Sequence, residues 1–153
     1  MSELKTTVQV RLYPTSEQAA ILRAHCQEYI STVNVLVAAL DSDMLPDGGK
    51  GTSTKDFTAA LPSAVKNQAL RDARSVWKRS CALGGIPLLH KPICQWNNQN
   101  WRMEDERLVL PVAQDGKVRQ ISADQRRLCL CGAGRDAGAA AYQTQAQARQ
   151  VGG

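Results

Sequence analysis

The chain has 153 residues, enough for one domain, and a net charge of +5; only 5% of its residues are aromatic, so aliphatic side chains must form any core. The longest apolar run, residues 33–40, is too short to span a membrane, and the first ten residues lack the apolar stretch of a signal peptide. Five cysteines, an odd number at irregular spacing, argue against a disulfide framework, so the expected location is the cytoplasm. The short apolar run likewise predicts no membrane partner.

The positive charge is concentrated in residues 57–91, which contain six basic residues and one acid, Asp72. Residues 15–56 carry three basic and six acidic side chains and are therefore negative. Because the excess of positive charge falls in one stretch, the expected partner is a polyanion.

Residues 6–14 alternate apolar and polar side chains, which predicts a half-buried strand that ends at Pro14. Thr15 and Gln18 then form a capping-box pattern at the start of an amphipathic helix. The predicted buried stripe of this helix recurs at spacings of three and four: Ala19, Leu22, Cys26, Tyr29, Val33, Leu36 and Leu40.

Residues 41–55 show no periodicity and predict a connection. A second helix is expected after Pro62, with Ser63 as its N-cap, and ends near Leu83 before two glycines. Its predicted apolar face comprises Val65, Ala69, Ala73, Val76 and Trp77. Its opposite face carries Asn67, Arg71, Arg74 and Lys78, so the helix can pack on one side and bind phosphates on the other.

After a proline-interrupted linker, the periodicity returns to two, and residues 101–103, 107–112 and 117–121 read as short strands. The acidic run 104–106 and the dipeptide Asp115-Gly116 separate them, which predicts an antiparallel meander. The first strand is expected to join this sheet. From about residue 130 the chain is small and polar, which predicts a disordered tail.

Four stretches occur in an order that resembles the N-terminal part of TnpB/OrfB proteins, which are transposon-encoded RNA-guided nucleases often described as transposases. They are VRLYPTSEQAAIL, NQALRDARSVWKR, the proline/lysine linker and NNQNWRMEDERLVLP, and the resemblance covers residues 5 to 121. It implies an α+β fold with four parts. Residues 1–14 and 92–128 would form a wedge-like β-barrel, residues 15–91 an inserted helical recognition lobe, and residues 129–153 a tail that we interpret as a frameshift product.

The family's catalytic part is a RuvC-like nuclease domain with three metal-binding carboxylates, together with a four-cysteine zinc ribbon. Neither fits in the remaining residues, so we expect a truncated chain that is no enzyme and uses no metal or cofactor. The expected partners are a structured guide-type RNA and double-stranded DNA beside the target, with any nuclease half on a separate chain. With these partners the protein would be associated with the nucleoid.

The resemblance places base-reading side chains at Ser53, Asn67, Asn97 and Asn98. Basic residues beside them are expected to bind phosphates: Lys66, Arg71, Arg74, Lys78, Arg79 and Lys91. The simplest alternative for the basic side chains is that they form a solvated helix face. The simplest alternative for the asparagine and serine side chains is hydrogen bonding within a turn.

Other features favour packing over chemistry. Glu104, Asp105 and Glu106 are consecutive and would diverge at a hairpin tip, so they predict a solvated turn and not a metal site. His25 and Cys26 are adjacent on a helix and are expected to pack in the core, as is at least one of Trp96 and Trp101.

Two alternatives to this function remain open at this point. One is a DNA-binding regulator or transposition accessory that needs no RNA. The other is a decayed transposase fragment without function, in which an uncovered sheet edge would favour aggregation.

Overall fold

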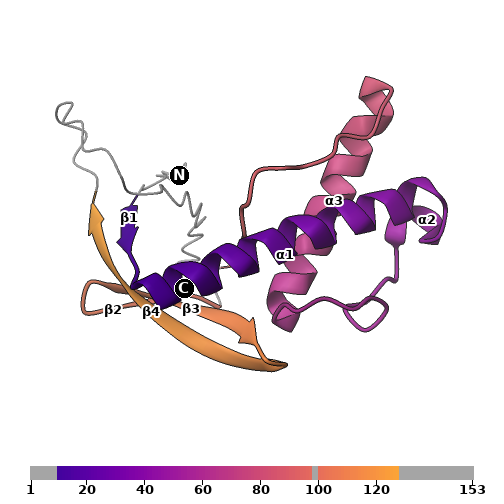
Figure 1. Cartoon of the computed structure of the whole chain (residues 1–153). Helices are drawn as coiled ribbons and strands as arrows, with labels where there is room; N and C mark the ends of the chain where they lie inside the picture. The colour runs from indigo at the N-terminus through magenta and orange to yellow at the C-terminus, as the bar shows by residue number, and fades with distance from the viewer. Residues whose placement is uncertain (1–9, 98–99, 128–153) are drawn as a thin grey trace, which may run out of the picture.

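The computed structural model of the protein describes residues 10–97 and 100–127. Its elements are β1 (Val10–Tyr13), α1 (Ser16–Asp41), α2 (Pro46–Gly49), α3 (Ser63–Leu83), β2 (Arg102–Glu104), β3 (Arg107–Gln114) and β4 (Lys117–Arg127) (Figure 1). The sheet lies at one end of α1, and α3 crosses α1 farther along (Figure 1). The prediction of helices inserted between the first strand and the later strands is confirmed. The predicted tail lies outside the described residues.

The four strands form one antiparallel sheet in the order β1-β4-β3-β2. The first strand therefore joins the later meander, as predicted, with Tyr13 opposite Asp124. The two hairpin turns are Asp105-Glu106 and Asp115-Gly116, and all four residues have positive φ, as the tight turns between twisted strands require. Strands β1 and β2 are the outer strands, so the described sheet is open and not closed on itself.

Helix α1 begins with the predicted capping box. The Thr15 hydroxyl accepts a hydrogen bond from the Gln18 backbone N–H at 3.2 Å, and the Gln18 side-chain oxygen accepts one from the Thr15 N–H at 3.0 Å. The predicted stripe is buried except at Ala19, which is half-buried. Spacing alone therefore located the face that packs against the rest of the molecule.

Helix α3 occupies the predicted range, but the prediction that Ser63 is its N-cap is wrong. Pro62 holds that position with φ −58° and ψ 148°, a conformation that the proline ring favours, and Ser63 is the first helical residue. The Pro62 carbonyl accepts the first helical hydrogen bond, from the Lys66 N–H at 2.9 Å. No side chain caps this end, while Gly84, at φ 77°, ends the helix as predicted.

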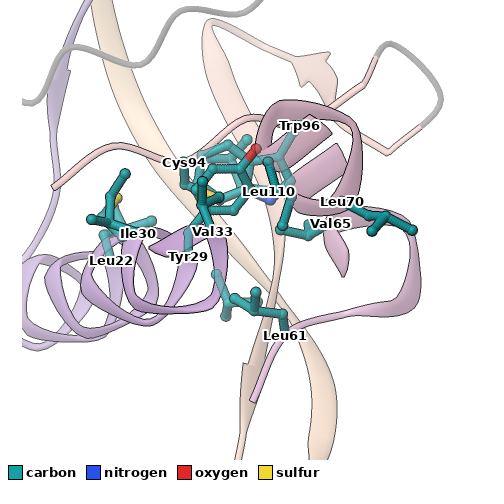
Figure 2. Close-up of a cluster of buried hydrophobic side chains, with 14 of the residues drawn as sticks. Leu22, Tyr29, Ile30, Val33, Leu61, Val65, Leu70, Cys94, Trp96 and Leu110 are labelled. Carbon is teal, nitrogen blue, oxygen red and sulfur yellow. The ribbon is translucent and has the colours of Figure 1, made fainter. Parts of the chain in front are cut away.

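One hydrophobic core joins α1, α3, the sheet and the segment before β2 (Figure 2). Tyr29 and Val33 of α1 lie beside Val65 of α3 and Leu110 of β3 in this cluster. Trp96 is also buried, and its indole N–H donates to the carbonyl of Pro111 at 2.9 Å. In the part of the chain that the structure describes, no helix is long and apolar enough to cross a membrane.

Candidate nucleic-acid interface

The exposed row of α3 follows from how the helix packs. Val65, Ala69 and Ala73 are buried, so the residues on the opposite side are turned outward. Asn67, Arg71 and Lys78 are exposed there, spaced four and seven residues apart along one side. We call these three residues the α3 row.

Arg74 has the spacing of the α3 row but a different environment. It is half-buried, and its guanidinium Nη2 donates to the backbone carbonyl of Gly49 in the turn that α2 forms. Gly49 needs its positive φ of 73° there, and a side chain at this position would meet Leu40 and Arg74 within 3.3 Å. Arg74 therefore ties the 46–52 loop to α3, a contact that the sequence pattern did not predict.

The other predicted phosphate-binding residues lie off this row. The Lys66 ammonium lies 5.8 Å from the centroid of the Phe57 ring and is half-buried. Arg79 is exposed and borders a cavity described below, about 100° around the helix from Lys78. Lys91 is exposed in the connection between α3 and β2. The six basic residues thus divide among several surfaces.

Two predicted base-reading residues sit in tight turns. The Ser53 carbonyl accepts from the Asp56 N–H at 3.1 Å, and its hydroxyl accepts from the Lys55 N–H at 3.2 Å. The Asn97 carbonyl accepts from the Asn100 N–H at 3.1 Å, and the two side chains are also hydrogen-bonded to each other. Turn formation thus occupies part of the hydrogen-bonding capacity of both residues. Asn98 lies outside the described residues.

The turn that ends at Asn100 lies beside the start of α3, and the two are separated by a hollow of about 420 Å³. Ser63 and Ala64 line it from α3, and Asn100, Trp101 and Arg102 line it from the segment that follows the turn. Asn67 follows Ser63 by four residues, so it lies on the same side of the helix, one turn farther along. The structure therefore brings Asn100 close to the start of α3, one helical turn before Asn67.

A partly buried polar network links α1, α3 and the segment before β2. The Tyr29 hydroxyl donates to one carboxylate oxygen of Asp72. The side-chain amide of Gln68 donates both to the other Asp72 oxygen, at 3.3 Å, and to the side-chain oxygen of Gln95, at 3.1 Å. Burial raises the pKa of Asp72, while the bonds from Tyr29 and Gln68 act in the opposite direction.

Sequence reasoning missed this network, although two signals for it existed. Tyr29 lies on the predicted buried stripe, and a buried tyrosine hydroxyl needs a hydrogen-bond partner. Asp72 is the sole acid of the basic segment and does not belong to the α3 row. Gln95 carried no signal, because its position depends on the path of the connection from α3.

His25 and Cys26 are packed in the core, as predicted, and Cys94 is buried as well. The ring of His25 stacks on Trp96, with centroids 5.4 Å apart, and burial lowers the pKa of His25 to about 4. Burial raises the pKa of Cys26 to about 11 and raises that of Cys94 further, so both are thiols at neutral pH. Within residues 10–97 and 100–127, no three His, Cys, Asp or Glu side chains lie where they could share a metal ion.

The acidic run at the first hairpin forms a turn, as predicted. Glu104 ends β2 and pairs with Arg102 at 2.5 Å, while Asp105 and Glu106 form the exposed tip.

Comparisons of the chain with protein-family models, with curated proteins and with solved structures found no match in any of the three.

Proposed function

We propose that this chain binds nucleic acid without cleaving it, as the N-terminal portion of a TnpB-like protein that lacks its nuclease domain. Its ligands in this proposal are a structured guide-type RNA and duplex DNA beside the target. The open four-stranded sheet would correspond to part of the wedge-like barrel, and the helices between β1 and β2 to the recognition lobe. The sequence resemblance and the order of these elements support this assignment.

The unopposed charge of the α3 row is the observation that supports the proposal most directly. Arg71 and Lys78 are exposed on one side of a helix whose other side is packed. Asp72, the one acid of this segment, is held by Tyr29 and Gln68 and forms no ion pair with a described lysine or arginine. Cations arranged in this way bind a phosphate backbone irrespective of its sequence.

The hollow at the start of α3 adds side chains that can read bases. Asn100 lines this hollow, and Asn67 lies on α3 one turn after Ser63, which also lines it. Both asparagines carry amides, which donate and accept hydrogen bonds. Arg71 and Lys78 follow on the same side of the helix, so one strand could contact both groups. In this arrangement the cations bind the backbone and the amides contact the base edges.

Binding is tested with fluorescently labelled structured RNA and duplex DNA, titrated with the purified chain at low salt. The double variant Arg71→Gln/Lys78→Gln removes two positive charges from the α3 row and should lower affinity about tenfold or more for both ligands. The control is Lys50→Gln/Lys55→Gln, which removes two exposed lysines from the acidic N-terminal half. Equal effects of the two double variants, or no binding by the native chain, would refute the proposal.

A DNA-binding regulator that needs no RNA would carry the same row, so a second measurement separates the two functions. The protein is purified with and without ribonuclease, and its binding to duplex DNA is compared. Loss of DNA binding after ribonuclease supports the RNA-dependent function, while unchanged binding supports the regulator. The proposal also predicts no cleavage of either ligand when Mg²⁺ is added.

A further inference from the structure

A small cavity lies over the partly buried polar network, on a different side of α3 from the α3 row. Its volume is about 240 Å³, and its walls come from α1, α3 and the segment before β2. Ile30, Val76 and Leu89 contribute apolar surface, while Asp72, Gln95 and Arg79 contribute polar groups. Pockets for drug-sized ligands begin at roughly 300 Å³, so this one has room for a single ring system.

The hydrogen-bonding groups in this cavity are fixed relative to one another. One side-chain amide, that of Gln68, donates to both Asp72 and Gln95 and so holds the two beside each other. Asp72 accepts one bond from Tyr29 and one from Gln68, and a carboxylate has about four lone-pair sites, so accepting capacity remains. Because the Gln95 side-chain oxygen accepts from Gln68, the amino group of Gln95 is left to donate.

This pattern is the complement of one nucleobase edge. Guanine presents an acceptor, O6, next to two donors, the ring N1–H and the exocyclic N2 amino group. Asp72 can accept from both donors while Gln95 donates to O6. Adenine and cytosine present a ring nitrogen acceptor where Asp72 needs a donor, and uracil has one N–H between two carbonyls. Unpaired bases in RNA are commonly read on this edge.

Arg79 supplies the remaining element of nucleotide recognition. It follows Asp72 by seven residues, on the same side of α3, and is exposed where it borders the cavity. A base inside the cavity would leave its ribose and phosphate outside, where a guanidinium can bind the phosphate.

We propose that this cavity binds a single unstacked guanine, with Asp72 and Gln95 on its Watson–Crick edge and Arg79 on its phosphate. The inference rests on the proposed nucleic-acid-binding function and adds a base-specific pocket to it, separate from the α3 row. It assigns Asp72 a role in recognition, so the acid in the basic segment has a function of its own.

The test uses the full chain and mononucleotides, measured by calorimetry. Guanosine monophosphate should bind at least about tenfold more tightly than adenosine monophosphate. Inosine monophosphate, which lacks the N2 amino group, should bind with intermediate affinity. Asp72→Asn, which nearly preserves shape, should remove the preference for guanine. Arg79→Gln should lower the affinity for guanosine monophosphate but leave the affinity for guanosine, which has no phosphate, unchanged.

Two results would overturn the inference, and both are measured on the native chain, so neither requires a variant. One is equal affinity of the native chain for the guanine and adenine nucleotides. The other is no mononucleotide binding by a chain that still binds RNA and duplex DNA, which refutes the pocket and leaves the proposed function standing. Failure to bind the polymers as well would refute both.

Discussion

The side-chain amide of Gln18 donates a hydrogen bond to the backbone carbonyl of Ser122 at 2.8 Å. Strand β1 ends at Tyr13, because Pro14 has no N–H with which to continue the ladder. The edge of β4 that precedes Asp124 therefore has no strand beside it among the described residues. Gln18, in the first turn of α1, bonds to this edge while its oxygen completes the capping box. One side chain thus fixes both the start of α1 and its position against the sheet.

The variant Gln18→Glu separates these two roles. Glutamate retains the capping oxygen but cannot donate to Ser122, so we expect the free energy of unfolding to fall by about 1 kcal/mol. Urea denaturation at high ionic strength measures this, since salt screens the attraction of a carboxylate to the helix N-terminus. Thr15→Ala is the control that removes the cap and keeps the bond to Ser122. A glutamate variant as stable as the native chain would show that this bond contributes nothing.

Much of the fold could be predicted from local patterns. The capping box, the stripe of α1 and both hairpin turns depend on residues within a few positions of one another, and all are confirmed. The bond from Gln18 to Ser122 spans 104 residues and depends on where β1 stops against β4. No periodicity encodes such a relationship.

The candidate site shows the same division. Spacing identified which face of α3 is exposed, and Arg71 and Lys78 lie on it. Spacing could not show that Arg74 bonds to Gly49, because the path of the 46–52 loop comes from tertiary packing. The partnership of Asp72 with Tyr29 was hidden for the same reason, since the two belong to different helices.

Arg71 and Arg74 form a matched pair for separating binding from stability. Arg74→Gln leaves the Gly49 carbonyl without its partner, so we expect it to lower the free energy of unfolding by about 1–2 kcal/mol. Arg71→Gln alters an exposed side chain and should change stability by less than about 0.5 kcal/mol. Thermal denaturation of both variants checks this. An equal loss of stability would mean that the contact with Gly49 does not hold the loop.

His25 makes the stability of the protein depend on pH. The pKa of His25 is about 4 in the folded chain and 6.5 when unperturbed, so between these values the unfolded chain binds a proton that the folded chain does not. Stability from this group is therefore present above pH 6.5 and is lost as the pH falls toward 4, by about 3 kcal/mol in total. The raised pKa of Asp72 has the opposite effect on stability, since it favours the folded state as the pH falls. The contribution of His25 is therefore measured by comparing the native chain with a variant at this position.

The variant His25→Phe supplies that comparison. Phenylalanine keeps an aromatic ring against Trp96 and removes two buried ring nitrogens that have no hydrogen-bond partner among the described residues. We expect the variant to be at least as stable as the native chain at pH 7 and more stable by about 3 kcal/mol near pH 4. Denaturant titrations across this range measure the difference. A difference that stays constant with pH would show that burial does not lower the pKa of His25, because the folded and unfolded chains would then bind its proton equally.

The salt dependence of binding counts the cations that contact phosphates. On duplex DNA the logarithm of the association constant falls with the logarithm of salt concentration by about 0.9 for each neutralised phosphate. If Arg71 and Lys78 each contact one phosphate, the double variant Arg71→Gln/Lys78→Gln should have a slope shallower by about 1.8. Arg74→Gln should leave the slope unchanged, because Arg74 bonds to Gly49. If Arg74→Gln makes the slope shallower by about 0.9, the guanidinium must leave the loop on binding, and the α3 row then includes four residues.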